Sequence, residues 1–304
     1  MTSYARDAHT GEGGSAIGPG RRAPVVVGVD AAGSALDALD WAAAEAASSD
    51  RPLRLVHAWT YPAAMTPYGF VGSVDSSYCR VAAEDILAEA VRRVRSVAVD
   101  IQVTTQSVLG TADEVLREQA TVAHLLVLGS RGRRRLGALL TGSVGARSVL
   151  RCRCPVTIVR AFAPVLPGPS AARVVVGVDV AAPSGPALRY AFKAAAQRGV
   201  GVTAVCASPA ASPDSPRHPG GAGRRSRLEH ILMEFSRTFP GVAAVAKVVP
   251  DRPAQALIGE SAGAALTVVG CRGRGQLRRA LGDSVSQRVL RCAHSPVAVL
   301  GPRC

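Results

Sequence analysis

The chain has few aromatic residues and no long apolar run. Only 4% of its 304 residues are Phe, Trp or Tyr, although 48% are hydrophobic, so Ala, Val and Leu must supply most of the core. Such residues suit parallel strands that helices bury on both faces. No apolar stretch approaches the ~18 residues of a membrane span, and residues 1–22 lack the apolar segment of a signal peptide. We therefore expect no membrane contact and a cytoplasmic protein.

Lysine is also scarce. Only Lys193 and Lys247 occur, so the net charge of +14 at pH 7 comes almost entirely from arginine. A basic chain can attract nucleic acids and other polyanions. Specific nucleic-acid binding, however, needs aromatic side chains that stack on bases or a recognition module, and the sequence offers neither. We therefore expect no specific nucleic-acid partner.

The seven cysteines and six histidines follow no pattern typical of disulfides or metal sites. The number of cysteines is odd, and Cys152-x-Cys154 has no second cysteine pair or histidine pair to complete a zinc site. In a reducing compartment such cysteines act as small apolar side chains. The sequence thus predicts no metal site.

What the sequence does contain is a long repeat. The segment VVVGVD occurs at 25–30 and again at 174–179. A second pattern, GSRG at 129–132 followed by GS at 142–143, returns as GCRG at 270–273 followed by DS at 283–284. A repeat of roughly 145 residues is too long for a solenoid unit and matches one whole domain. The chain is therefore predicted to be a tandem of two related domains.

Strand and helix patterns alternate through both copies, which predicts α/β domains with parallel strands joined by right-handed crossovers. Short β-branched runs indicate strands at 25–30, 53–59, 101–108, 124–128 and 156–160, and again at 173–179, 201–207, 242–249, 265–270 and 296–300. Helical patterns in the first copy cover 34–47, 77–98, 112–119 behind a Thr111 cap, and 143–150, and Pro253 suits the first turn of a helix in the second copy. Loops rich in Pro and Gly are expected at 60–76 and 208–224.

These patterns also divide the chain. We expect a disordered segment at 1–22, a first domain at 23–161, a short stiff linker at 162–171 and a second domain at 172–301. Below, the two copies are called the first unit and the second unit.

In an open parallel sheet, ligands bind beside the carboxyl ends of the strands, where the strand order reverses. Asp30 ends the first strand, His57-Ala58 ends the second, and the Gly129–Ser143 loop follows the fourth. The loop glycines allow a concave run of backbone amides, and a helix that begins at Ser143 favours negative charge at its amino end. This predicts a phosphate site. In the alternative interpretation, the glycines only make turns and Ser143 only caps a helix.

The loop differs from two better-known phosphate motifs. No GK[ST] follows it, so it is not a Walker P-loop, and its glycines follow the fourth strand rather than the first, so it is not a dinucleotide fingerprint. His57 could suggest proton chemistry, but Cys206 occupies the matching place in the second unit. We therefore interpret His57 as part of the core or the pocket wall.

Both units resemble universal stress protein domains, and residues 23–301 together resemble the tandem members of that family. The motif that carries the resemblance is G-x2-G-x9-G-[ST] after the fourth strand, together with the aspartate that ends the first strand. The resemblance implies two doubly wound domains, each with a five-stranded parallel sheet of order 3-2-1-4-5 and helices on both faces. For the ATP-binding branch, it also implies an adenine nucleotide, ATP with Mg²⁺, held by this loop.

The resemblance assigns positions around this nucleotide in the first unit. Val29, Asp30 and Ala58 would border the adenine and ribose. The ribose and phosphates would be held by Gly129, Arg131, Gly132, Gly142, Ser143 and Val144. The corresponding second, weaker site comprises Val178, Asp179, Ala207, Gly270, Arg272, Gly273, Ser284 and Val285.

The second site is expected to be weaker because Asp283 replaces Gly142. Two unit charges about 4 Å apart at an effective dielectric of ~20 repel by about 4 kcal/mol, and by less where water reaches them. A bridging Mg²⁺ could offset this repulsion. We predict that the first unit holds most of the nucleotide.

The sequence shows no nucleophile–base pair and no paired carboxylates, so we predict no catalytic residues and at most weak ATPase activity. The leading hypothesis is an ATP-binding regulatory or stress-response protein that acts through nucleotide-dependent conformation and contacts with an unidentified protein partner. An interaction scaffold without nucleotide, and a slow ATPase or nucleotidyl transferase, are the alternatives. The family pattern adds pairing of Val156–Arg160 with Val297–Leu300 as an intramolecular pseudo-dimer, and a homodimer of the whole chain stays open.

Overall fold

The computed structural model describes residues 22–30, 36–60, 65–66, 69–70, 76–130, 152–160, 170–182, 184–207, 221–270, 284–301 and 304. Several sequence predictions lie outside these residues. They are the disordered segment before residue 22, the helix at 143–150, most of the linker at 162–171, and most of the loops at 60–76 and 208–224.

The first unit is an α/β domain built on a parallel sheet. Its strands are β1 (Val25–Gly28), β2 (Leu53–Trp59), β5 (Val103–Leu109), β6 (Leu125–Ser130) and β7 (Val156–Arg160), and its helices include α1 (Leu36–Ser48), α2 (Ser76–Val97) and α3 (Ala112–Gln119). The strands pair in the order β5-β2-β1-β6-β7, with every pair parallel. This is the expected order 3-2-1-4-5.

The second unit repeats that arrangement. Its strands are β8 (Val174–Gly177), β9 (Val202–Ala207), β10 (Ala244–Val249), β11 (Leu266–Gly270) and β12 (Val297–Leu300), and its helices include α6 (Gly185–Arg198), α7 (Gly221–Thr238), α8 (Pro253–Glu260) and α9 (Val285–Cys292). The order β10-β9-β8-β11-β12 is again 3-2-1-4-5, with parallel pairs throughout. The predicted fold class is confirmed.

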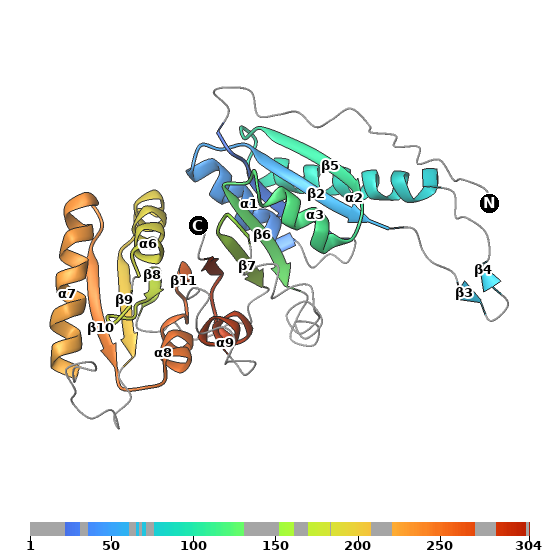
Figure 1. The fold of residues 1–304 in the computed structure, drawn as a ribbon. Coiled ribbons are helices and arrows are strands. Elements are labelled where there is room, and N and C mark those ends of the chain that lie inside the picture. The colour runs from blue at the N-terminus through green and yellow to red at the C-terminus, as the bar shows by residue number, and fades with distance from the viewer. Residues whose placement is uncertain are drawn as a thin grey trace.

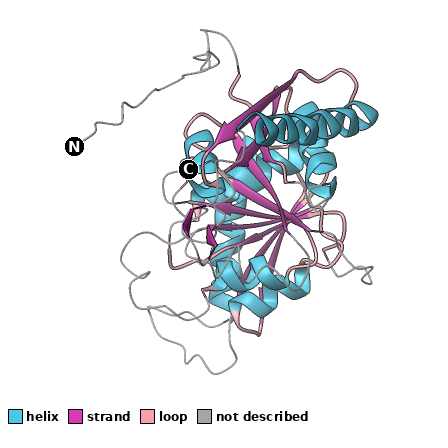
Figure 2. Ribbon diagram, turned by 90° about the vertical axis from the view of Figure 1, so that its right-hand side faces the viewer, coloured by secondary structure: helices cyan, strands magenta, loops and turns pink. Residues whose placement is uncertain are grey.

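The two sheets join through their last strands. β7 and β12 pair antiparallel, with Val297 opposite Ile158 and Val299 opposite Val156, so the chain forms a ten-stranded sheet (Figure 1). The expected pairing of Val156–Arg160 with Val297–Leu300 is therefore present. Seen from the side, the strands fan through the middle of the molecule, and helices cover both faces (Figure 2).

The core follows from the alternation of side chains along buried strands. On one face, Val25 and Val27 of β1 pack with α1 and α2, and in the second unit Val174 and Val176 of β8 pack with α6 and α7. On the other face, one cluster runs through both units, from Val26 in β1 to residues of α8 and α9. Because β7 and β12 pair, this cluster crosses the junction without interruption.

The glycine inside each repeated VVVGVD segment allows a helix to pack closely on the strand. A Cβ added at Gly28 would lie 3.0 Å from Cδ2 of Leu128 and 3.2 Å from Cδ2 of Leu116 in α3. A Cβ at Gly177 would lie 2.9 Å from Cδ1 of Leu257 in α8. The repeated glycine is thus a packing position in both units.

Local details extend or correct the sequence predictions. Thr111 caps α3 as predicted, since its hydroxyl oxygen accepts a hydrogen bond from the Glu114 N–H at 3.4 Å. The expected loop at 60–76 contains a small antiparallel hairpin of β3 (Met65–Thr66) and β4 (Gly69–Phe70), whose strands are too short to show a periodic pattern. The expected loop at 208–224 ends earlier than predicted, because α7 already begins at Gly221.

Among the described residues, no helix combines the length and the apolar character that crossing a bilayer requires.

Candidate functional site

The strand order of the first unit reverses between β1 and β6, because the chain leaves β1 for β2 on one side and returns to β6 on the other. Gly28 is level with Val56 of β2 and with Leu128 of β6. The residues that follow, among them Asp30 and Gly129, therefore emerge at one edge of the sheet. This is the position where open α/β sheets bind ligands.

His57 links β2 to the segment that follows β1. Its Nδ1 lies 2.8 Å from the carbonyl oxygen of Val29, and because a carbonyl only accepts, Nδ1 carries the proton and donates. The Val29 N–H in turn donates to the Val56 carbonyl at 2.9 Å. The half-buried His57 ring thus contacts the backbone just before Asp30 and forms part of this edge of the sheet.

The described part of the first candidate site lies at this edge. Val29 is 8% exposed, and Asp30 and Ala58 are half-buried. Gly129 belongs to β6, where it is level with Val159 of β7. The remaining residues predicted for this site lie outside the described residues; they are Arg131, Gly132, Gly142, Ser143 and Val144.

At the same edge of the second unit, Asp179 organises its own loop. Its Oδ1 accepts a hydrogen bond from the Ala181 N–H at 3.0 Å, and its carbonyl accepts from the Ala182 N–H at 3.1 Å. The Ser184 hydroxyl bonds to the backbone of Asp179, with 3.2 Å between the Asp179 nitrogen and Ser184 Oγ. These contacts form a closed turn that leads from β8 into α6.

The end of β9 contacts an arginine that the sequence patterns did not single out. Arg224 of α7 donates through a guanidinium nitrogen to the carbonyl of Ala207 at 3.2 Å. Burial raises the pKa of the neighbouring Cys206 thiol, and Arg224 acts in the opposite direction. Arg224 lies 17 positions after Ala207 across a loop, so no local spacing links the two residues.

Ser284 caps α9. Its hydroxyl oxygen accepts a hydrogen bond from the Gln287 N–H at 3.3 Å, and its backbone is extended at φ −62° and ψ 148°. The amides at this end of α9 and the helix dipole favour a negative charge. Val285, also predicted for the second site, begins the helix and is 37% exposed. Arg272, Gly273 and Asp283 lie outside the described residues.

The structure therefore brings together the strand-end residues of each candidate site. Val29 and Asp30 follow β1, and Ala58 lies near the end of the adjacent β2. In the second unit, Val178 and Asp179 follow β8, and Ala207 ends the adjacent β9. Gly270 ends β11 beside β8. Within the described ranges, no group of three or more His, Cys, Asp or Glu side chains is arranged to hold a metal ion.

Two buried thiols match their interpretation as apolar side chains. Cys152 and Cys154 are each 4% exposed and belong to the cluster that crosses the junction. Burial raises the pKa of Cys152 to about 11 and that of Cys154 to about 12. Both therefore stay protonated at neutral pH.

Comparison with known proteins gives the same family for both units. The model of the universal stress protein family matches residues 22–160 and 171–301. The universal stress protein Rv2005c of Mycobacterium tuberculosis is 34% identical over 288 residues, which cover 92% of this chain and 98% of that protein.

A solved structure supports the fold over most of the chain. A universal stress protein from Archaeoglobus fulgidus DSM 4304 matches 91% of this chain and 96% of its own, with a TM-score of 0.68 and 18% identity. A universal stress protein solved in complex with cAMP matches 45% of this chain and 95% of its own, with 29% identity and a TM-score of 0.36.

Proposed function

This chain belongs to the universal stress protein family, and we propose that it is a regulatory protein that binds ATP mainly in its first unit. The nucleotide would lie at the carboxyl edge between β1 and β6. Val29, Asp30 and Ala58 would border the base and ribose there. Gly129, Arg131, Gly132, Gly142, Ser143 and Val144 would hold the ribose and phosphates. Nucleotide occupancy would alter the loops around this edge and thereby the contacts with a protein partner.

The observation that carries the proposal is a coincidence of two features in the first unit. The strand order reverses between β1 and β6, and the glycine-rich loop begins at Gly129 at the end of β6. Open α/β sheets bind ligands at such a point, and glycines let a phosphate approach the backbone closely. Neither feature alone would indicate a phosphate ligand.

The second unit is proposed as the weaker site because its loop carries Asp283 where the first unit has Gly142. A nucleotide there would also have to accommodate the bond from Arg224 to the Ala207 carbonyl and the bond from the Ala181 amide to the Asp179 carboxylate. Asp30 of the first unit is engaged in a contact as well, so the proposed asymmetry rests on Asp283. The proposed boundaries of the units remain 23–161 and 172–301.

One described residue of the second unit is compatible with a phosphate ligand. Ser284 of the second unit begins a helix, and its hydroxyl oxygen accepts from the helix, so its own hydrogen is left to donate. Mg²⁺ would be held largely by the phosphates and water, as is usual for this ion. ATP with Mg²⁺ would thus need few protein carboxylates, and we propose a binding protein rather than an efficient ATPase.

The test uses the whole chain and a reciprocal pair of variants. Gly142→Asp gives the first unit the residue of the second, and Asp283→Gly does the reverse. Isothermal titration with Mg·ATP should give about one site in the wild type, none of comparable affinity in Gly142→Asp, and about two in Asp283→Gly. Purified wild-type protein should also release an adenine nucleotide on denaturation, identified by mass.

The outcomes separate the alternatives. A wild-type protein that releases no nucleotide and shows no thermal shift with Mg·ATP would reject the proposal and favour an interaction scaffold. Two equal sites in the wild type would reject the asymmetry alone. Steady ATP turnover that Asp30→Ala abolishes, while binding persists, would favour an enzyme.

A further inference from the structure

A cavity of about 620 Å³ lies between the two units. In the first unit it is lined by residues that precede β1, β6 and β7, among them Ala23, His124 and Arg153. It therefore opens at the amino ends of these strands, on the edge opposite Asp30 and Gly129. Among the residues proposed for the two nucleotide sites, none of those that the structure describes lines it.

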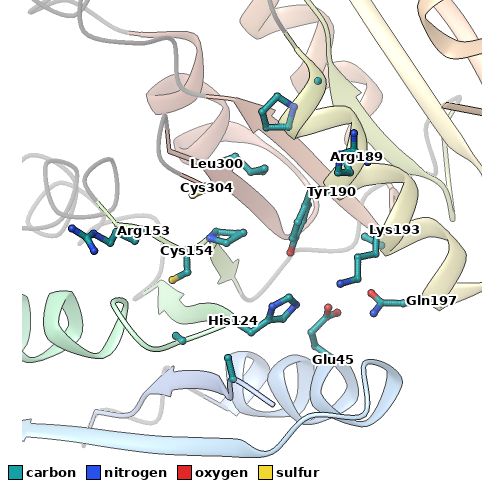
Figure 3. A pocket seen from close by; sticks show the side chains of 16 residues that line it. Glu45, His124, Arg153, Cys154, Arg189, Tyr190, Lys193, Gln197, Leu300 and Cys304 are labelled. Carbon is teal, nitrogen blue, oxygen red and sulfur yellow. The ribbon is translucent and has the colours of Figure 1, made fainter. Parts of the chain in front are cut away.

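The second unit contributes one face of α6 to the cavity. Pro186, Arg189, Tyr190, Lys193 and Gln197 line it at intervals of one, three or four residues. Side chains three and four apart share a face of a helix, so α6 presents a continuous row to the first unit. In Figure 3, Tyr190 and Lys193 extend from α6 toward the space, with His124 facing them from the first unit.

The lining carries more positive than negative charge. Arg153, Arg189 and Lys193 line the cavity, whereas Glu45 is the single acidic side chain among the described residues that line it. Glu45 is already held, because its Oε2 accepts a hydrogen bond from the guanidinium of Arg198. Glu45 therefore does not neutralise the three cations.

Lys193 differs from the other lysine in its surroundings. Among the residues that the structure describes, no carboxylate oxygen lies within ion-pair distance of its ammonium, whereas Lys247, the other lysine, pairs with Glu260 at 2.5 Å. Nearby positive charges, including that of Lys193, also act on His124. Burial, then the charges of Arg51 and Lys193, lowers the pKa of His124 to about 4. The ring is thus neutral at physiological pH.

We propose that this cavity binds a small anion with at least two negative charges, carried by phosphate or carboxylate groups. Lys193 and Arg189 of the second unit would donate to it, and the first unit would close the other side. The volume lies within the range of small-molecule sites, and Pro155, Pro186 and Leu300 provide an apolar wall. Such a ligand would bridge the two units. The inference does not depend on nucleotide binding at the carboxyl edges.

The experiment titrates the full-length protein with pyrophosphate and, separately, with citrate, at low ionic strength and without nucleotide. At least one probe should bind, and its affinity should fall as salt is added, because the cations are exposed and therefore screened. Binding of pyrophosphate alone would identify a phosphate ligand, and binding of citrate alone a carboxylate ligand. Failure of both to bind more tightly than about 1 mM would overturn the proposal.

Variants locate the binding. Lys193→Gln should weaken the affinity roughly tenfold, the usual effect of losing one hydrogen bond to a charged group. Arg227→Gln is the matched control, since it removes the same charge from an exposed position on α7 that does not line the cavity. Equal weakening by both variants would indicate non-specific attraction and overturn the proposal.

Two further measurements separate this site from the nucleotide loop. Gly142→Asp, which alters the proposed phosphate loop, should leave the affinity for the probe unchanged, and a comparable loss there would assign the probe to that loop instead. By NMR, the bound anion should raise the pKa of His124 by roughly one unit. A titration of His124 that is the same with and without saturating probe would contradict binding in the cavity.

Discussion

The two units share a scaffold but differ at the edge where a ligand would bind. Both have the strand order 3-2-1-4-5, and in both the glycine of the VVVGVD segment lies against a leucine, Leu116 or Leu257. At the carboxyl edge, by contrast, the first unit has His57 bonded to the Val29 carbonyl, whereas the second has Arg224 bonded to the Ala207 carbonyl.

This difference separates two kinds of constraint. A glycine packed under a helix cannot change without moving the neighbouring side chains, because protein interiors are close-packed. Residues at strand ends and in loops meet no such restriction, and they are where binding properties differ between related domains. The retained packing and the different strand ends therefore fit one duplicated fold whose carboxyl edges have diverged.

The junction of the units is itself asymmetric. Glu45 of α1 pairs with Arg198 of α6, and the guanidinium carbon of Arg198 lies 5.5 Å from the centroid of the Trp41 ring. In the repeat, the positions that correspond to Glu45 and Arg198 are occupied by Ala194 and Ser49, so the equivalent contact has no ion pair. One charged contact thus links α1 and α6.

The largest expected effect comes from breaking this contact. In Glu45→Ala, Arg198 loses its partner although its side chain is only 18% exposed. Removal of one member of a buried pair typically costs about 3–5 kcal/mol, and we expect about 3 kcal/mol here because Arg198 retains some solvent. Urea unfolding followed by circular dichroism measures the loss, and the units should begin to unfold separately.

Glu89→Ala is the control for this change. It removes a carboxylate that pairs with Arg92 on the exposed surface of α2, where the two side chains are 69% and 67% exposed. Exposed pairs contribute about 0–1 kcal/mol. If Glu45→Ala destabilised the chain no more than Glu89→Ala, the ion pair would not be a significant link between the units.

The next effect tests the shared scaffold. Gly28→Val and Gly177→Val should each lower the free energy of unfolding by about 2–3 kcal/mol, the usual cost of overpacking a core. A Cβ at Gly177 would lie 2.9 Å from Leu257 Cδ1, so Leu257→Ala should recover part of the loss in a double-mutant cycle. Similar losses of unfolding free energy in the two variants would support equal packing constraints in both units. A loss in one variant alone would show that the two units do not share this constraint.

Most of the fold was predictable because its strands are short, β-branched and buried. The expected strand at 53–59 agrees with β2, and that at 156–160 with β7. The strand order and the antiparallel β7–β12 pair were accessible through the family resemblance, since neither leaves a local pattern in the sequence. The β3–β4 hairpin was missed because two-residue strands are too short for periodicity.

The candidate site was less predictable than the fold. Asp30, Asp179 and Ser284 could be selected because each stands next to a strand or a helix start. Arg224 was missed because its contact with Ala207 depends on how α7 packs across a loop. The cavity between the units was missed for the same reason: Lys193 and His124 come from different units and meet only in the folded chain.

A smaller effect concerns how the stability of the first unit depends on pH. The pKa of His124 is lowered to about 4 from its ordinary 6.5, chiefly by burial. The unfolded chain therefore binds the proton more readily, so this contribution to stability is present above pH 6.5 and is lost as the pH falls toward 4. Since the half-exposed ring is partly screened, we expect about 1–2 kcal/mol.

His124→Gln measures this contribution, because glutamine does not titrate. The difference in unfolding free energy between pH 7 and pH 4.5 should be smaller in the variant than in the wild type. Ala265 occupies the corresponding position before β11, so the second unit lacks this dependence. An unchanged pH profile in His124→Gln would show that other groups determine the acid stability of the first unit.

The smallest effect concerns the helix start in the proposed second site. Ser284→Ala removes the hydroxyl that accepts from the Gln287 N–H, and loss of such a cap typically costs about 1 kcal/mol. Ser284→Gly should cost only a few tenths of a kcal/mol, because glycine tolerates the cap position. If the second unit also binds nucleotide through Ser284, saturating Mg·ATP would widen the gap between wild type and Ser284→Ala. If the serine acts there only as a cap, nucleotide should leave the difference in unfolding free energy between wild type and Ser284→Ala at about 1 kcal/mol. That result would sharpen the contrast with the first unit.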